Sequence, residues 1–121
     1  MVAVQQEAQK QSERAAELGA KLREKLMTLD PKSDTARRGY VMLGELNLAQ
    51  GDLVGAASSW QVALDASFDP TLAARTADVL SAAAGHVTPE AAALFRRALA
   101  AAPPDAPWRS YAEQRLAGTG S

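Results

Sequence analysis

The chain has 121 residues, enough for one domain with a continuous core. Hydrophobic residues make up 47% of it and aromatic residues 5%. Because alanine and leucine dominate the hydrophobic share, the composition indicates close-packed helices. Thirteen basic and fourteen acidic residues give a formal charge of −1, so no global field would attract nucleic acid or an anionic membrane. The absence of cysteine excludes a disulfide framework and a thiolate metal site.

Residues 1–33 predict an N-terminal helix or linker. Apolar residues recur there at steps of mostly three or four residues, as on one stripe of a helix: Ala8, Ala15, Leu18, Leu22, Leu26 and Leu29. The first half of this segment is almost wholly polar and reads as a solvated extension. It contains neither an export signal nor an apolar run long enough to span a membrane, so we expect no direct membrane contact from this fragment.

Two helix hairpins follow, each marked by local start and stop residues. Residues that cap helix N-termini stand before each apolar stretch, and Gly51 and Gly85 end the first helix of each pair. The predicted caps are Asp34, Asp52, Asp69 and Thr88. The predicted helices are 34–50, 53–66, 71–84 and 89–102.

A last helix is expected after Pro103 and Pro104. Asp105 is its predicted cap, and Trp108, Tyr111 and Leu116 supply its apolar side. Residues 118–121 are rich in glycine and predict a flexible tail. The sequence thus predicts an all-α superhelix of about six helices, with a repeat domain over residues 34–117.

The second helix of each hairpin repeats in sequence. A shift of about 35 residues aligns small and aromatic residues of the two hairpins. The aligned pairs are Ala56 with Ala91, Ala57 with Ala92, Trp60 with Phe95, Ala63 with Ala98, and Leu64 with Leu99. Small residues at these positions let helices approach closely, and the shared aromatic ring fills the space between hairpins.

The first repeat resembles the tetratricopeptide (TPR) family. The residues that match its signature in order are Tyr40, Leu43, Gly44, Gly51, Asp52, Ala56, Trp60 and Ala63. The match departs at Asn47, where the family has an aromatic residue, and at Phe68, where it has proline. The second repeat matches at Ala91, Phe95, Ala98 and Pro103. The resemblance implies a TPR-like fold that binds another polypeptide.

A narrower segment is similar to the TPR region of the CcmI/CycH family of c-type cytochrome biogenesis factors. It carries the turn from Gly85 to Glu90 and the run Asp105, Ala106, Pro107, Trp108 and Arg109. This resemblance implies the periplasmic, soluble part of an inner-membrane-anchored protein that holds apocytochrome c for haem ligation. The alternative is a general TPR scaffold or assembly adaptor of the bacterial envelope.

In stacked hairpins the first helix of each pair lines the partner groove. The residues expected to face a partner there are Arg38, Val41, Glu45, Leu48, Thr76, Leu80 and Ala83. This mostly apolar set suits an amphipathic partner helix. The alternative is that Val41, Leu48 and Leu80 pack against the N-terminal helix, which could itself cover the groove or mediate self-association.

The other residues that could carry chemistry favour structural roles. Trp60, Phe95 and Tyr40 follow the repeat and are expected in the core, and Trp108 is expected on the last hairpin. His86 is expected to be a solvated turn residue. The chain contains no motif typical of a hydrolase, phosphate loop or metalloprotease, so neither catalysis nor a cofactor is predicted. Arginines 96, 97, 109 and 115 are interspersed with acidic residues, which argues against a nucleic-acid site.

Overall fold

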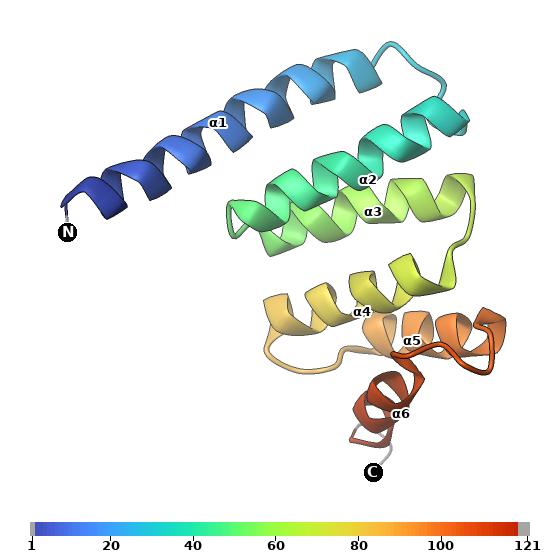
Figure 1. Ribbon diagram of the computed structural model, residues 1–121. Coiled ribbons are helices and arrows are strands. Elements are labelled where there is room, and N and C mark those ends of the chain that lie inside the picture. Colours follow the sequence, from blue (N-terminus) through green and yellow to red (C-terminus); the bar gives the residue numbers. More distant parts are fainter. Residues whose placement is uncertain (1, 119–121) are drawn as a thin grey trace.

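The structure, a computed structural model, describes residues 2–118 and the side chains of residues 5–118. These residues form six helices and no strand, which confirms the predicted all-α fold (Figure 1). The helices are α1 (Val2–Leu26), α2 (Asp34–Ala49), α3 (Leu53–Ala66), α4 (Pro70–Ala84), α5 (Pro89–Ala101) and α6 (Arg109–Ala117). Of the predicted flexible tail, only Gly118 belongs to the described residues.

The helices stack in chain order. Helices α2 and α3 form one hairpin, α4 and α5 form the next, and α3 packs against α4 where the hairpins meet. Helix α1 packs on α2 and α6 packs on α5, so the two ends of the chain lie at opposite ends of the stack (Figure 1). Consecutive contacts of this kind are typical of helical repeats.

Three of the four predicted caps of the hairpin helices are confirmed. The side chains of Asp52, Asp69 and Thr88 accept hydrogen bonds from backbone N–H groups in the first turns of α3, α4 and α5. The helix stops are also confirmed, because Gly51 and Gly85 adopt φ angles of 78° and 83°, which favour glycine.

The predicted cap of α2 is wrong by one residue. The hydroxyl of Ser33 accepts the hydrogen bond from the N–H of Ala36 at 3.1 Å, and Asp34 lies inside the first turn. There the Asp34 carboxylate accepts hydrogen bonds from Arg37 and Arg38 instead. A short hydroxyl side chain at the preceding position reaches the backbone donor equally well, which leaves the carboxylate free for the arginines.

The start of the last helix is also wrong. Helix α6 begins at Arg109, and Trp108 occupies the cap position without a side-chain hydrogen bond to the helix. Asp105 lies in the preceding turn, whose backbone closes through hydrogen bonds from Ala106 to Pro103 and from Arg109 to Ala106. Residues 103–108 therefore form turns, and the helix expected to begin after Asp105 begins at Arg109.

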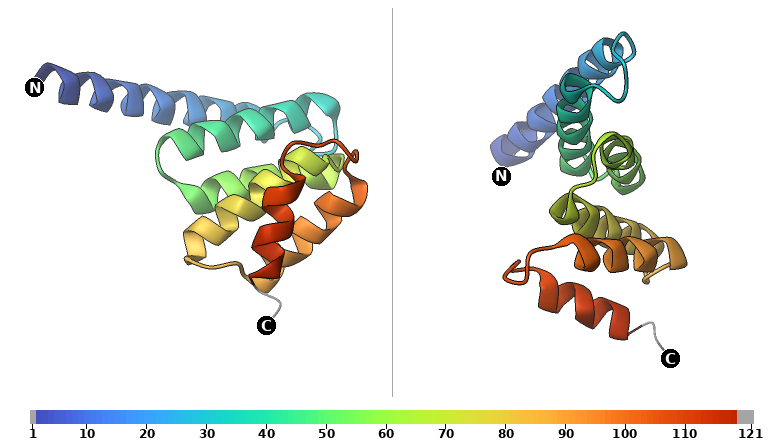
Figure 2. Two further views of the ribbon diagram at one scale, coloured as in Figure 1. Left: turned by 60° about the horizontal axis from the view of Figure 1, so that its bottom comes forward. Right: turned by 90° about the vertical axis from the view of Figure 1, so that its right-hand side faces the viewer.

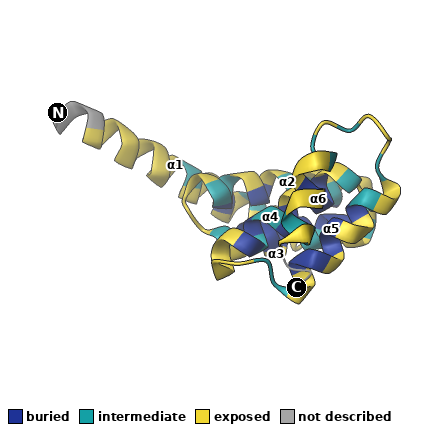
Figure 3. Cartoon of the chain, turned by 90° about the horizontal axis from the view of Figure 1, so that it is seen from below, coloured by how far each residue is buried: buried dark blue, intermediate teal, exposed yellow. Residues whose placement is uncertain are grey.

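Helix α1 is anchored only through its C-terminal half. Leu26 is buried with Ala36 and Leu43 in an N-terminal cluster, and Leu22 packs against that cluster. The stretch from Gln5 to Arg14 is exposed throughout and extends beyond the hairpins (Figures 2 and 3). The predicted solvated extension is therefore helical, and the apolar stripe becomes buried only where α2 lies against it.

The main core is formed by α3, α4, α5 and Ala112 of α6. Trp60 and Phe95 are completely buried in it, and the aligned alanine pairs 56 with 91, 57 with 92 and 63 with 98 are buried beside them. Leu64 is buried too, whereas its counterpart Leu99 is half-buried. The repeat read from the sequence is thus a repeat of core positions. No helix in the described part of the chain is both long and apolar enough to cross a bilayer.

Candidate functional site

Trp60 joins the two hairpins. Its ring is fully buried on α3, and its Nε1–H donates to the backbone carbonyl of Val41 on α2 at 3.1 Å. A Cβ atom at position 44 would lie 2.1 Å from that nitrogen, so Gly44 leaves the room that the indole occupies. The guanidinium carbon of Arg75 on α4 lies 4.6 Å from the ring centroid, a distance at which a cation is attracted to the ring.

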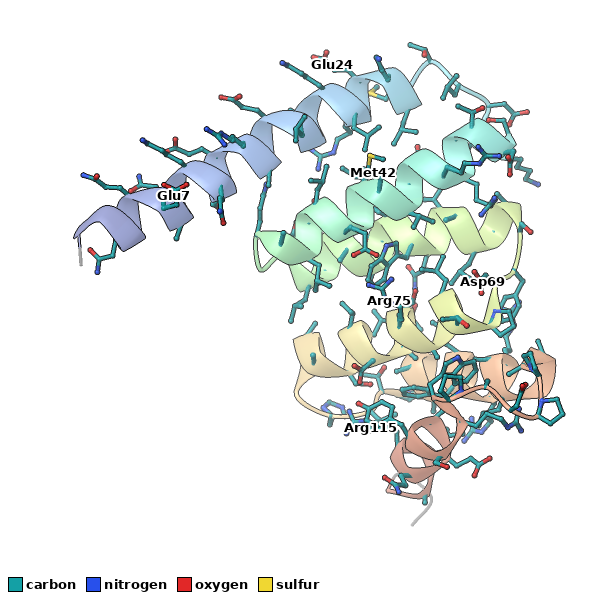
Figure 4. All side chains as sticks on the ribbon, viewed as in Figure 1. Glu7, Glu24, Met42, Asp69, Arg75 and Arg115 are labelled. Atoms are coloured by element: carbon teal, nitrogen blue, oxygen red, sulfur yellow. The ribbon has the colours of Figure 1, made fainter. Side chains whose placement is uncertain are left out.

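Arg75 also connects α4 to α2 directly. Its Nη1 lies 2.7 Å from Oε1 of Glu45, and both side chains are close to half exposed. Figure 4 shows Arg75 reaching from α4 toward α2. An exposed ion pair contributes little stability, but stacking on Trp60 and pairing with Glu45 together fix the position of the guanidinium.

A hollow of about 190 Å³ lies beside this contact, and we call it the α2–α4 hollow. Its lining residues are Arg37 and Val41 of α2, Ala63 of α3, Ser67 and Asp69 of the α3–α4 link, and Thr71, Leu72 and Arg75 of α4. Sites for drug-sized molecules measure roughly 300–1,000 Å³. The hollow therefore suits one side chain of a larger partner better than a complete small molecule.

The rim of the α2–α4 hollow is charged, and its charges are paired. Hydrogen bonding from Arg37, together with the nearby charge of Arg38, holds the pKa of the Asp34 carboxyl below its ordinary value. Asp69 accepts hydrogen bonds from the backbone N–H groups at the start of α4. A partner would meet two arginine side chains, Arg37 and Arg75, that neighbouring carboxylates already hold in place.

The four groove residues predicted on α2 have different positions. Val41 is half-buried and lines the α2–α4 hollow. Glu45 is exposed and pairs with Arg75, and the exposed Arg38 pairs with Asp34 at 2.5 Å. Leu48 is half-buried against the main core. Only Val41 of this set contributes to the hollow.

The prediction for α4 is wrong at Thr76. This residue is completely buried, and its hydroxyl donates to the backbone carbonyl of Leu72 at 2.8 Å, so it cannot face a partner. Leu80 is half-buried against the main core. Ala83 is exposed but does not line the hollow.

The error arises from the register of α4. Along α4 the exposed Arg75 and buried Thr76 correspond to the exposed Met42 and buried Leu43 of α2. The link from α4 to α5 has four residues, against three from α2 to α3. The correspondence between α2 and α4 is a shift of 33 residues, two fewer than the 35 that align α3 with α5. The longer link accounts for one of the two, so the α3–α5 spacing does not extend to α4, and Thr76 faces the core.

Sequence reasoning consequently missed the residues that do line the hollow on α4. Thr71 and Arg75 are exposed there, and Arg37 is their neighbour on α2. The longer α4–α5 link, residues 85–88, is the one sign in the sequence that the repeat spacing changes before α5, and it accounts for one of the two residues of difference.

The alternative prediction placed Val41, Leu48 and Leu80 against the N-terminal helix. All three pack against the main core, and none of them is among the residues packed on the N-terminal cluster around Leu26. None of the residues that line the α2–α4 hollow belongs to α1. The N-terminal helix packs on α2 and leaves this hollow open.

The predicted core and turn residues lie mostly as expected. Tyr40 is half-buried and contacts both clusters. Trp108 is half-buried against the main core, and its Nε1–H donates to the Thr71 hydroxyl at 3.2 Å. His86 is exposed in the turn, where its Nδ1 lies 3.2 Å from the carbonyl oxygen of Ala84. Asn47, a departure from the TPR signature, is buried and donates to Ser59.

The side chain of Arg109, the first residue of α6, reaches back to the end of α5. Its Nη1 donates to the carbonyls of Leu99 and Ala102 at 3.0 and 3.4 Å, where helices have unpaired acceptors. Arg97 lies over the ring of Phe68, with its guanidinium carbon 4.5 Å from the centroid. Both side chains stabilise packing between segments.

Within the described residues, no three His, Cys, Asp or Glu side chains are grouped so that they could hold a metal ion. Comparison with known protein families, with curated proteins and with solved structures found no match to this chain.

Proposed function

We propose that this chain is a protein-binding, TPR-like module that performs no catalysis and receives a polypeptide at the α2–α4 hollow. The observation that carries the proposal is the hollow itself, which opens where two stacked hairpins meet. Its wall is apolar at Val41, Ala63 and Leu72, and its rim carries Arg37 and Arg75. Helical repeats typically bind partners along such surfaces.

A partner helix fits this chemistry better than an extended strand, because no strand edge is present in the described residues for a peptide to extend. One apolar side chain of the helix would enter the hollow, with burial contributing about 25 cal/mol per Å² before ordering costs. Acidic side chains on the next turns would meet Arg37 and Arg75.

The resemblance to the CcmI/CycH family names such a partner. On this basis the protein is the soluble part of a c-type cytochrome biogenesis factor, and it holds the C-terminal helix of apocytochrome c for haem ligation. It would act in the periplasm, joined to an inner-membrane anchor. An alkaline phosphatase fusion in the parent protein tests this location, because the fusion is active only when the domain is exported.

Calorimetric titration with a peptide of the C-terminal helix of an apo c-type cytochrome tests the proposal. We expect saturable binding with a negative heat-capacity change, weaker at high salt. Val41→Asp should reduce affinity at least tenfold because it places a charge on the apolar wall. The matched control is Val54→Asp, which makes the same change at an exposed position of α3 that does not line the hollow.

The alternative function is a scaffold or assembly adaptor of the bacterial envelope. No binding of the cytochrome peptide, combined with capture of another envelope protein that Val41→Asp abolishes, would favour it. Equal effects of Val41→Asp and Val54→Asp on every partner would contradict the hollow as the binding site.

Self-association through α1 is a separate proposal. Leu18 is 56% exposed within the apolar stripe of α1, so it is available to a second copy. If α1 joins two chains, light scattering should give a dimer mass that Leu18→Asp reduces to a monomer mass. A monomer mass for the unmodified chain would reject the idea.

A further inference from the structure

A second hollow, of about 510 Å³, lies between the turn that joins α4 to α5 and helix α6. We call it the α6 hollow. Figure 4 shows Arg115 on α6, on the side that approaches this turn. Its lining residues are His86, Val87, Tyr111, Gln114, Arg115 and Gly118, and none of them lines the α2–α4 hollow.

Arg115 is the feature that indicates a ligand. The residue is half-buried, and its Nε is buried without a hydrogen-bond partner. Within the described residues this is the one buried side-chain nitrogen or oxygen in that condition. A buried donor attached to a charged group is costly to leave unpaired. A ligand that brings an acceptor to this nitrogen would therefore gain more binding free energy than it would at an exposed arginine.

The neighbouring polar groups limit which ligand fits. The Tyr111 hydroxyl donates to Oδ1 of Asp78, so its proton is already committed to that carboxylate. Gln114 adds an amide that can donate to an oxygen. Apart from His86, Arg115 is the one basic side chain among the lining residues, and the Asp78 carboxylate, bound to Tyr111, adds a negative charge beside the hollow. A singly charged oxyanion suits this balance better than a doubly charged one.

We propose that the α6 hollow binds a carboxylate group of a polypeptide through Arg115. The guanidinium presents paired N–H donors in a planar fork, and this fork matches the two oxygens of a carboxylate. A carboxylate bound at the edge of the guanidinium that carries Nε would supply the acceptor that this nitrogen lacks. The carboxylate comes either from a chain terminus or from an acidic side chain. This site is independent of the α2–α4 hollow.

NMR titration of the full chain tests the proposal, with the Nε–Hε signal of Arg115 as the readout. N-acetyl-alanine represents a chain terminus, and N-acetyl-glutamate α-amide represents an acidic side chain. N-acetyl-alaninamide, which lacks the charge, is the control. We expect saturable shifts of Arg115 and of the backbone at Gly85 and His86 with at least one carboxylate, at millimolar concentration, and none with the amide.

Whichever of the two carboxylates gives the larger shifts identifies whether a chain terminus or an acidic side chain is bound. Saturable shifts with either carboxylate support the site. Arg115→Gln should abolish the shifts, whereas Arg96→Gln should leave them unchanged, because Arg96 is exposed on α5 outside the hollow. If Arg115→Gln alters the fold, the comparison of carboxylate with amide on the unmodified chain decides the matter. Equal shifts with the amide, no shifts, or a stronger response to inorganic phosphate would overturn the assignment.

Discussion

Replacing Gly44 by alanine tests the close contact between α2 and α3 within the first hairpin. The added Cβ would lie 2.1 Å from Nε1 of Trp60 and 2.4 Å from its Cδ1. The indole cannot move aside easily, because it is fully buried and its Nε1–H donates to the Val41 carbonyl. The substitution should therefore push α2 away from α3 or break that hydrogen bond.

The expected loss of stability follows from three terms. Overpacking a core costs about 1–3 kcal/mol, and leaving the buried indole N–H unpaired costs about 1–3 kcal/mol more. Alanine recovers about 1 kcal/mol because glycine is a poor helix former. The net prediction is a decrease of about 3 kcal/mol in the free energy of unfolding.

Urea unfolding followed by circular dichroism measures this change. The matched control is Gly19→Ala on α1, where the new Cβ would lie 3.7 Å from the nearest atom, Cδ1 of Leu43. That variant should be as stable as the unmodified chain or up to about 1 kcal/mol more stable. Gly39→Ala should fall between them, because its close contact is the flexible end of Leu26. A Gly44→Ala protein no less stable than Gly19→Ala would refute the packing argument.

Three further predictions concern charges and hydrogen bonds. A double-mutant cycle of Glu45→Gln and Arg75→Gln should give a coupling energy of about 0.5 kcal/mol, because the pair is exposed. This coupling should decrease in about 1 M salt. A coupling energy above about 2 kcal/mol would contradict the prediction. The hydrogen bond from Tyr111 to Asp78 raises the pKa of the phenol above 10.0, so its stabilisation is present below that pH and lost as pH rises through the folded-state pKa. Tyr111→Phe should remove this alkaline loss in chemical unfolding, and an unchanged profile would count against the bond. The pKa of Asp34 is lowered from 3.8 by Arg37 and Arg38, so its stabilisation is lost as pH falls through the lowered value, and Asp34→Asn should make stability less dependent on pH below 4.

The helices themselves could be predicted from the sequence. Asp52, Asp69 and Thr88 act on backbone donors within three residues, and Gly51 and Gly85 end helices through their own φ angles. These effects are local, so they need no knowledge of the fold. The one-residue error at Asp34 occurred where two adjacent residues compete for one local role.

The core was also largely predictable, because the repeat places residues of like size at like positions. Trp60 and Phe95 align in sequence and are both completely buried. The close approach at Gly44 is explained by the position of the Trp60 indole against α2.

The candidate sites depended on information that no local pattern contains. Which side of α4 faces outward depends on its packing against α3 and α5, and in this packing Thr76 is buried and Arg75 is exposed. The unpaired Nε of Arg115 is likewise a property of how α6 lies against the α4–α5 turn. The sequence by itself determined most helix ends, except at Ser33 and before α6, and most of the core, because caps, glycines and small residues act locally or through the repeat. Only the tertiary structure decided the rotation of each helix about its axis, because that depends on contacts between segments far apart in the chain.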